Sequence, residues 1–312
     1  MGVQLQRGAH PVTTVANPGK RDRLWRGFVI TLPYAWLLLF FLAPFAIVLK
    51  ISFADPLVAQ PPFTPFFDWT AHAGNRILAT LDNYRFLLED NLYWVSYLKS
   101  IKIALIATLL CLLLGFPMAY AIALAPHPWR NLLLLLVILP FWTSFLLRVY
   151  AWMVMLGKQG LVNNLLLSTG LIDQPLQMLY TDGAVYLGIV YTYVPFMILP
   201  LYASLEKLDP DVHEAAADLG AKPLRVFYDV TLPLAMPGII AGSLLVFIPA
   251  LGEFVIPALL GGLDSLMIGR TLYDEFFVNR DWPLASAVAI VLLLILILPI
   301  MLFQRLQQES DA

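Results

Sequence analysis

The sequence predicts an all-α polytopic membrane protein with six transmembrane helices. Hydrophobic residues make up 60% of the 312 residues and charged residues only 13%, and the mean hydropathy of +0.78 is too high for an ordinary soluble domain. Six stretches of about 20 mostly apolar residues have the length that a helix needs to cross the hydrocarbon. Prolines are frequent inside these stretches, and membrane helices tolerate such kinks where neighbouring helices or a cavity satisfy the freed carbonyls.

The chain divides into two polar tails and a membrane domain. Residues 1–26 are polar and basic and lack the apolar core of a cleavable signal peptide, so they are expected to form a tail, as are residues 304–312. The longest connection, residues 51–97, is rich in aromatic residues, which favour the membrane boundary, and residues 81–99 suit an amphipathic helix there. Residues 27–303 form the six-helix domain, with spans expected at 27–49, 103–125, 131–157, 184–205, 234–260 and 284–303.

Basic residues decide the expected orientation of the spans. Six spans place both termini on the same side of the membrane. That side carries ten Lys and Arg residues in its tails and loops, against five on the other side, and cytoplasmic segments carry the excess of positive charge. Both termini and the loop at residues 206–233 are therefore expected in the cytoplasm, and the loop at residues 51–97 on the opposite, periplasmic side.

The polar stretch at residues 208–237 interrupts the apolar pattern and is expected to form two short helices joined at a glycine. Asp209 suits the cap of the first helix, Pro210 its first helical position and Asp211 its positive end. Gly220 suits a left-handed residue that ends this helix. Residues 214–217, Glu followed by three Ala, give the helix a slim middle that another protein's groove can approach closely. Composition alone leaves open a loop that lies on the lipid headgroups.

The same stretch resembles the EAA signature of ABC-importer permease subunits. The match consists of Glu214-Ala215-Ala216, then Gly220, then Val230-Thr231-Leu232-Pro233, with Val in place of the usual Ile and with the signature's spacing preserved. The resemblance implies a type I ABC permease fold. It also implies that the loop couples this chain to an ATPase, through Glu214, Ala215, Ala216, Gly220 and Pro233.

Three further stretches resemble the polyamine branch of these permeases, and most closely its putrescine permeases. They are residues 139–152, 252–257 and 279–286, within a similarity that runs from about residue 83 to 301. The resemblance implies a multi-pass protein of the bacterial inner membrane that pairs with a second permease subunit as a heterodimer. It further implies two ATPase subunits that bind ATP and Mg, a periplasmic solute-binding protein, and a polyamine substrate, with putrescine first and spermidine second.

Several motifs of catalysis are missing from the sequence. No phosphate-binding loop of the form G-x-x-x-x-G-K-[ST] occurs, and neither H-E-x-x-H nor G-x-S-x-G is present. The four histidines fall in expected loops or tails, and the single cysteine, Cys111, falls in an apolar run where it suits a small buried side chain. The chain is therefore expected to be no enzyme, to bind no metal or cofactor of its own, and, without a basic stripe, to bind no nucleic acid.

Two ionisable residues lie inside the expected spans. Such a group costs at least ~2.5 kcal/mol in hydrocarbon and usually faces a cavity or a partner. Arg148 and Glu253 either pair with each other, or Arg148 reaches the outer headgroups and Glu253 lies on the substrate pathway between Pro249 and Pro257. Aromatic residues in spans three and four offer ring faces to an ammonium group, although packing explains most membrane aromatics; they are Trp142, Tyr150, Trp152, Tyr191 and Tyr193.

The sequence thus favours one half of the pathway of an ABC importer. An ion-coupled secondary transporter without ATPase partners is the alternative; such proteins usually carry inverted repeats and buried ion ligands, and here only Glu253 would serve. A third alternative is a membrane scaffold without transport. Copurification with ATPase subunits would distinguish an ABC importer from the secondary transporter and the scaffold.

Overall fold

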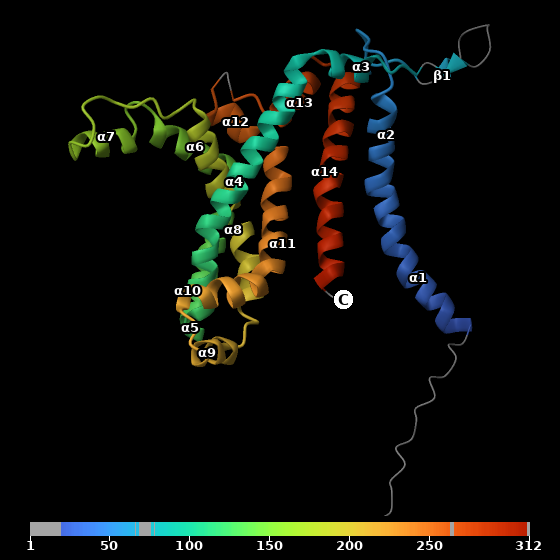
Figure 1. Cartoon of the computed structure of the whole chain (residues 1–312). Coiled ribbons are helices and arrows are strands. Elements are labelled where there is room, and N and C mark those ends of the chain that lie inside the picture. The colour runs from blue at the N-terminus through green and yellow to red at the C-terminus, as the bar shows by residue number, and fades with distance from the viewer. Residues whose placement is uncertain (1–19, 66, 69–75, 78, 263–264, 311–312) are drawn as a thin grey trace, which may run out of the picture. The chain divides into compact units, whose positions relative to one another are not determined.

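The computed structural model describes residues 20–65, 67–68, 76–77, 79–262 and 265–310 (Figure 1). Residues 1–19, which belong to the predicted N-terminal tail, and residues 311–312 lie outside this range. The chain forms two compact units, residues 1–50 and 51–312. The described elements are helical apart from a two-stranded antiparallel ribbon of Phe67–Asp68 (β1) and Arg76–Ile77 (β2). The prediction of an all-α membrane fold is confirmed.

The first unit contains the first predicted span. Helix α1 (Lys20–Leu37) continues through a π-helical turn, η1 (Leu38–Leu42), into α2 (Ala43–Ile51). The stretch Gly27–Ile51 is long and apolar enough to cross a membrane, which agrees with the span expected at residues 27–49. Helix α1 already begins at Lys20, so the last residues of the predicted tail are helical.

The second unit opens with an irregular segment that a buried asparagine holds in place. The Nδ2 amide of Asn83 donates to the carbonyl oxygens of Ser52 at 3.0 Å and Ala54 at 2.8 Å. Asn83 lies in α3 (Asp82–Glu89), and Asp90 then caps α4 (Asn91–Leu124) by accepting from the Leu92 amide at 2.8 Å. The amphipathic helix expected at residues 81–99 is therefore divided between α3 and the start of α4, and the second span begins earlier than predicted.

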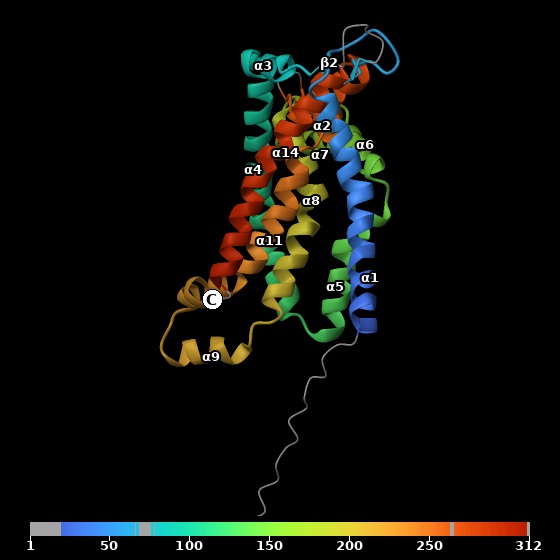
Figure 2. The same cartoon turned by 90° about the vertical axis from the view of Figure 1, so that its right-hand side faces the viewer.

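Three long helices form the centre of the second unit (Figure 2). They are α4, α8 (Asp182–Leu205) and α11 (Leu232–Leu251), and each contacts the other two extensively. Glycines let α11 approach α8 closely: a Cβ at Gly242 would lie 2.8 Å from the Met197 sulfur, and one at Gly238 would lie 2.7 Å from the Pro200 carbonyl oxygen. Small residues at such crossings are how membrane helices pack without a hydrophobic driving force between them.

The third predicted span is broken. It consists of α5 (His127–Ile138), a short 3-10 helix, η2 (Leu139–Trp142), α6 (Phe145–Leu156) and α7 (Leu161–Ser168), and the two halves meet at 88°. Thr143 and Ser144 have extended backbone between the halves, and Pro140 donates no backbone hydrogen bond. The span predicted at residues 131–157 therefore contains a sharp bend, at the position of one of the prolines that were expected to kink the spans. Of the described helices, five can cross a membrane, or six if the bent pair is one span.

The fifth predicted span is also interrupted. Helix α11 ends at Leu251, and after Gly252, Glu253 and Phe254 the chain resumes in α12 (Val255–Leu260). Helix α13 (Ile268–Tyr273) and a π-helical turn, η4 (Asp274–Val278), lead to α14 (Trp282–Ser310). The stretch that is long and apolar enough to cross a membrane is Trp282–Met301, and the helix continues beyond it through residues 304–310 of the predicted C-terminal tail.

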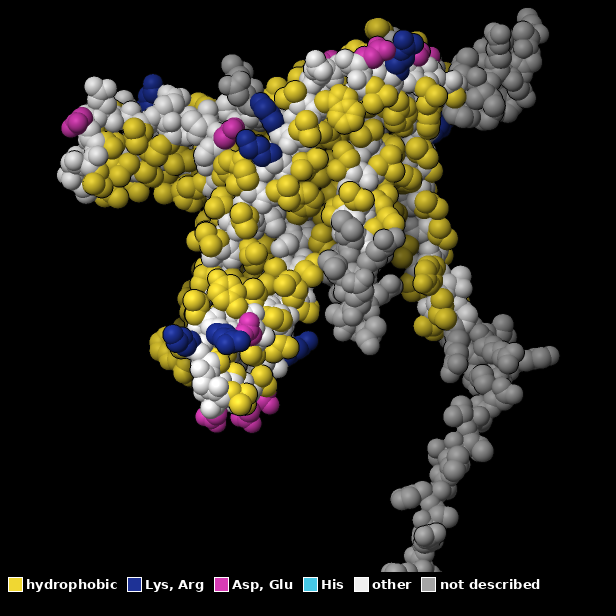
Figure 3. Space-filling view, in the orientation of Figure 1, with side chains coloured by type: hydrophobic (Ala, Val, Ile, Leu, Met, Phe, Trp, Pro, Cys, Tyr) yellow, Lys and Arg dark blue, Asp and Glu magenta, His cyan; other side chains and the backbone are white. Residues whose placement is uncertain are grey.

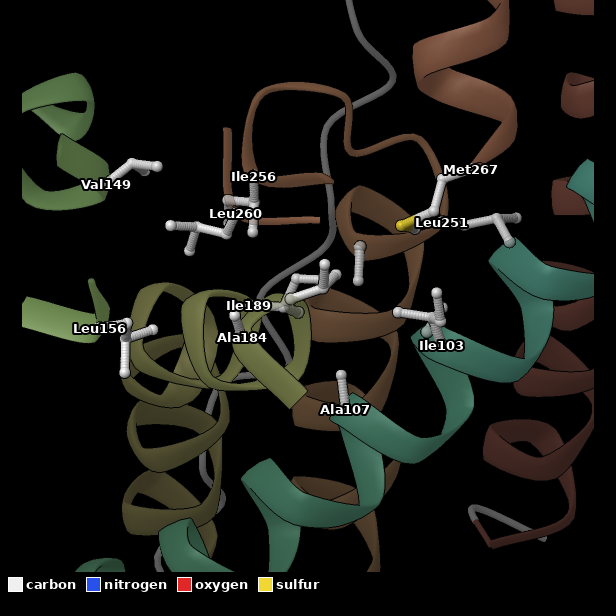
Figure 4. Close-up of a cluster of buried hydrophobic side chains, with 13 residues drawn as sticks. Ile103, Ala107, Val149, Leu156, Ala184, Ile189, Leu251, Ile256, Leu260 and Met267 are labelled. Atoms are coloured by element: carbon white, nitrogen blue, oxygen red, sulfur yellow. The ribbon is translucent and has the colours of Figure 1, made fainter. Parts of the chain in front are cut away.

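A buried apolar cluster joins the two broken spans to the central helices (Figure 4). Ile103 and Ala107 of α4, Val149 of α6, Ile189 of α8 and Ile256 of α12 all contribute to it, and each is less than 5% exposed. The cluster fixes α12 against α6 and α8. The interruption after Leu251 is therefore a packed feature of the fold.

Candidate functional site

The candidate coupling loop follows α8 and is built as the sequence predicts. Helix α9 (Pro210–Asp218) begins with Pro210, and the side chain of Asp209 accepts a hydrogen bond from the Asp211 amide at 3.1 Å. At its end Gly220 has φ +79, its amide donates to the Ala217 carbonyl at 2.8 Å, and the Ala221 amide donates to the Ala216 carbonyl at 3.1 Å. This pair of bonds is a Schellman motif, which satisfies two carbonyls that a helix end otherwise leaves unpaired.

The second half of the loop runs directly into the central bundle. Lys222 precedes α10 (Pro223–Val226), which continues through a π-helical turn, η3 (Phe227–Thr231), into α11, where Pro233 is the second residue. The Phe227 ring packs edge-on against Phe116 of α4, with 5.5 Å between the ring centroids. A force applied to α10 is therefore applied to α11 and α4 as well.

The surface of the loop is exposed and partly apolar. Glu214 and Ala215 are exposed, and Ala216 is half-buried. Leu219, Leu224 and Tyr228 expose large apolar side chains, and Leu219 is 89% exposed. Acidic side chains gather at the same end of the second unit (Figure 3). A charged face with apolar groups inside it is typical of a protein-binding surface.

Glu253 occupies the interruption between α11 and α12 and is 7% exposed. Its Oε1 accepts hydrogen bonds from the amides of Phe254, Val255 and Ile256 at 3.1, 3.0 and 3.4 Å. Its Oε2 accepts from the hydroxyl of Tyr193 at 2.6 Å. The side chain therefore caps α12 and ties it to α8. Its four donors are neutral groups, so they stabilise a carboxylate without cancelling its charge.

The structure brings only some of the predicted aromatic residues together. Tyr193 reaches Glu253, and Trp152 of α6 lies edge-on to Tyr191 of α8, with 5.4 Å between the centroids. Trp142 and Tyr150 instead expose 74% and 48% of their surface. These two residues are therefore free, within this chain, to meet lipid, a partner subunit or a substrate.

Arg148 and Glu253 do not pair within the described part of the chain. The Arg148 guanidinium lies over two rings of the bent third span instead, 5.4 Å from the Phe141 centroid and 5.9 Å from that of Phe145. Cation–π contacts of this kind offset part of the cost of a charge outside water. Its Nε and Nη1 are buried and donate to no hydrogen-bond acceptor among the described residues.

Sequence reasoning missed an ion pair next to the coupling loop. Nη1 of Arg130, in the first turn of α5, lies 3.0 Å from Oε1 of Glu206, the first residue of the linker between α8 and α9. The two residues are 76 positions apart, and only the packing of α5 beside α8 brings them together.

Comparison with known proteins identifies the family. Residues 12–309 match the family described as binding-protein-dependent transport system inner membrane component. The chain belongs to this family. It is 46% identical over 230 residues to the spermidine/putrescine transport system permease protein PotB of Escherichia coli (strain K12), with 74% of this chain and 83% of that protein covered. The PotB protein of Salmonella typhimurium (strain SL1344) is 41% identical over 286 residues, with 92% and 95% covered.

A solved structure shows the same fold. The crystal structure of a bacterial alginate ABC transporter in complex with an alginate pentasaccharide-bound periplasmic protein contains a chain with a TM-score of 0.65 and 19% identity, and 93% of this chain and 96% of that chain are covered. Membership in the inner-membrane component family confirms the predictions of an ABC-importer permease, of a multi-pass inner-membrane protein and of a subunit without catalysis of its own.

Proposed function

We propose that this permease forms one half of the pathway of an ATP-driven polyamine importer. Putrescine is the favoured substrate, and spermidine is the next candidate. A second permease subunit completes the pathway as a heterodimer, two ATPase subunits bind and hydrolyse ATP with Mg, and a periplasmic solute-binding protein delivers the substrate. Both termini and the coupling loop at residues 206–233 face the cytoplasm. The relatives named spermidine/putrescine permeases support the substrate, and the excess of basic residues supports the orientation.

The geometry of α9 is the observation that carries the coupling role. A capped helix with Glu214, Ala215 and Ala216 on an accessible surface stands outside an otherwise apolar bundle. Its two ends are fixed by Asp209 and Gly220, so the helix is formed before any partner binds. Preorganisation of this kind lowers the entropic cost of docking. Together with Pro233, these residues are the proposed contact with the ATPase.

Glu253 supports a cationic substrate. A buried carboxylate whose donors are all neutral leaves a net negative charge at the break in the fifth span. Such a charge in a region of low dielectric attracts cations more strongly than it would in water. We propose that Glu253 and Tyr193 border the pathway, with Trp152, Tyr191, Tyr150 and Trp142 as the aromatic residues that an ammonium group meets.

Reconstitution tests the proposal. The chain is purified from its native membrane, and the copurifying subunits are identified by mass spectrometry. The complex is then placed in proteoliposomes with ATP inside and labelled putrescine and the binding protein outside. ATP-dependent uptake that unlabelled putrescine and spermidine reduce, and that amino acids leave unchanged, is the expected result.

Two other outcomes would contradict parts of the proposal. Uptake driven by an ion gradient, with no ATPase subunit in the preparation, would support the secondary transporter instead. ATP-dependent uptake that amino acids suppress and polyamines do not would keep the importer and reject the substrate. A matched control is a binding-protein preparation without bound polyamine, which distinguishes substrate delivery from leakage.

A further inference from the structure

One guanidinium joins three helix ends beside the coupling loop. Arg130 lies in the first turn of α5; its Nη1 donates to Oε1 of Glu206 at 3.0 Å, and its Nη2 donates to the carbonyl oxygen of Ala123 at 2.9 Å. Ala123 is the second-last residue of α4, and Glu206 directly follows α8. The planar fork of Arg allows both bonds at once, which a Lys ammonium at the same place would not reproduce.

We call Arg130, Glu206 and the Ala123 carbonyl the clamp, and its charged side chains are partly shielded from water. The Arg130 side chain is 24% exposed and that of Glu206 44% exposed, and Tyr202 of α8 interacts with both charged groups. The Nε of Arg130 is buried and has no hydrogen-bond partner among the described residues. Because a buried donor without an acceptor is unfavourable, a shift of the helix ends that brings an acceptor to Nε would stabilise the arrangement.

A cavity lies between Arg130 and the coupling helix. It has a volume of about 400 Å³, and its lining includes Arg130 and Glu206, Glu214 of α9, and Tyr120 and Leu124 of α4. Helix α9 is therefore not packed tightly against the ends of α4 and α5. Movement of α9 therefore reaches α8 through the short linker that starts at Glu206.

We propose that Arg130 is a positioning residue that transmits displacement of α9 to α4 and α5. On its C-terminal side α9 is joined by the turn at residues 219–222 to α10, which continues as helix through η3 into α11. On its N-terminal side the linker residue Glu206 is bonded to Arg130, so a pull on the linker moves α5 and the end of α4 together with α8. Without this bond, α5 would lose its direct connection to the linker, whereas α4 would still contact the coupling loop through Phe116 and Phe227. The inference rests on the proposed coupling role of the loop.

The test compares transport with ATP hydrolysis in the same vesicles. For R130A in the reconstituted complex we expect normal assembly and retained ATP hydrolysis, but about tenfold less putrescine taken up per ATP, within the range typical of coupling between sites. R130K keeps the charge but not both bonds and is expected to be intermediate. The double variant R130E/E206R restores the ion pair but not the bond to the Ala123 carbonyl, and it is expected to exceed the single variants R130E and E206R in uptake per ATP.

The controls separate coupling from stability. Arg85 and Glu89 form an exposed ion pair at 2.7 Å on α3, and R85A is expected to keep the wild-type ratio because exposed pairs contribute little. An unchanged ratio in R130A would overturn the proposal. If R130A does not assemble, R130K is used instead. A lowered uptake of putrescine per ATP in an assembled R130K complex supports the proposal. A wild-type uptake per ATP, or loss of assembly in both variants, rejects it.

A distance measurement makes the test independent of the substrate. Spin labels at Leu135 of α5 and Leu245 of α11, both exposed, report whether α5 moves relative to α11 when ATP is added. The distance is expected to change in the wild-type complex and not in R130A. If the wild-type complex takes up no polyamine, the proposed substrate fails while this measurement still tests the clamp. An equal change in both complexes would contradict the inference.

Discussion

The hydroxyl of Tyr193 on α8 donates a 2.6 Å hydrogen bond to Oε2 of Glu253, 60 residues further along the chain. Oε1 of the same carboxyl group caps α12 through three backbone amides. One side chain therefore fixes both the start of α12 and its attachment to the central bundle. It does so at the point where the fifth span is interrupted, so the carboxyl group serves the architecture and the proposed pathway at once.

Replacing Tyr193 by Phe tests this junction. The variant removes the donor to Oε2 and leaves the ring in place, and hydrogen bonds to charged groups contribute about 1.5–3 kcal/mol. We expect a lower thermal midpoint of the purified complex in detergent and reduced uptake. Y191F is the matched control, because Tyr191 stands two residues earlier on the same helix and packs edge-on to Trp152. Equal losses in the two variants would show that the bond to Glu253 has no particular role.

Glu253→Gln separates charge from capping. The amide oxygen of Gln can still accept from the α12 amides, so the fold and assembly are expected to persist while the negative charge is lost. Uptake of a dication is therefore expected to fall. Glu253→Ala removes the acceptor as well and is expected to cost about 1 kcal/mol or more in stability, as loss of a helix cap does. Wild-type uptake by the Gln variant, measured at equal amounts of assembled complex, would remove Glu253 from the pathway.

The coupling loop could be predicted from sequence because its determinants are local. Asp209, Pro210 and Gly220 each act within a few residues, and the structure places all three as expected. The bend of the third span could not be predicted in the same way. Pro140 signals a break, but the 88° angle depends on the packing of α6 against α12, which is distant in sequence.

The contacts of the candidate site were the least predictable part. The sequence singled out Glu253 and Tyr193 separately, yet their hydrogen bond depends on the rotation of α8 about its axis. Arg130 and Glu206 gave no pattern at all, because two charges in different turns carry no periodic signal. Arg148 was expected to pair with Glu253 or to reach the outer headgroups; among the described residues it forms no ion pair with Glu253, and its guanidinium lies over Phe141 and Phe145.

Gly220→Ala is expected to weaken the coupling loop without a steric clash. No heavy atom lies within 4 Å of a Cβ built at this position, but the φ of +79 is unfavourable for L-residues. A left-handed conformation costs an Ala residue about 1–2 kcal/mol. The expected result is a smaller fraction of permease that copurifies with ATPase subunits at limiting ATPase concentration. G220N is the control, since Asn adopts this conformation more readily, and it should retain more ATPase than the Ala variant.

Gly238→Ala tests the close approach of α11 to α8. A Cβ there would lie 2.6 Å from the Ser204 hydroxyl oxygen and 2.7 Å from the Pro200 carbonyl oxygen, so one helix must move. Overpacking of this kind typically costs about 1–3 kcal/mol. We expect a lower thermal midpoint and reduced assembly. G183A, on α8, is the matched control because its Cβ would have only an ordinary 3.6 Å contact; a midpoint that falls as far in the control would contradict the packing argument.

The proposed orientation predicts the side from which α9 can be labelled. The native Cys111 is 0% exposed, so it is expected to leave a low background with a thiol reagent that cannot cross membranes. A cysteine introduced at Ala217, which is exposed on α9, should react with that reagent in inside-out vesicles and remain unlabelled in intact cells. A cysteine at Val58, which is fully exposed in the loop after the first span, should show the reverse pattern. Labelling of Ala217→Cys in intact cells would place α9 outside the cytoplasm, and an ATPase could then not bind there.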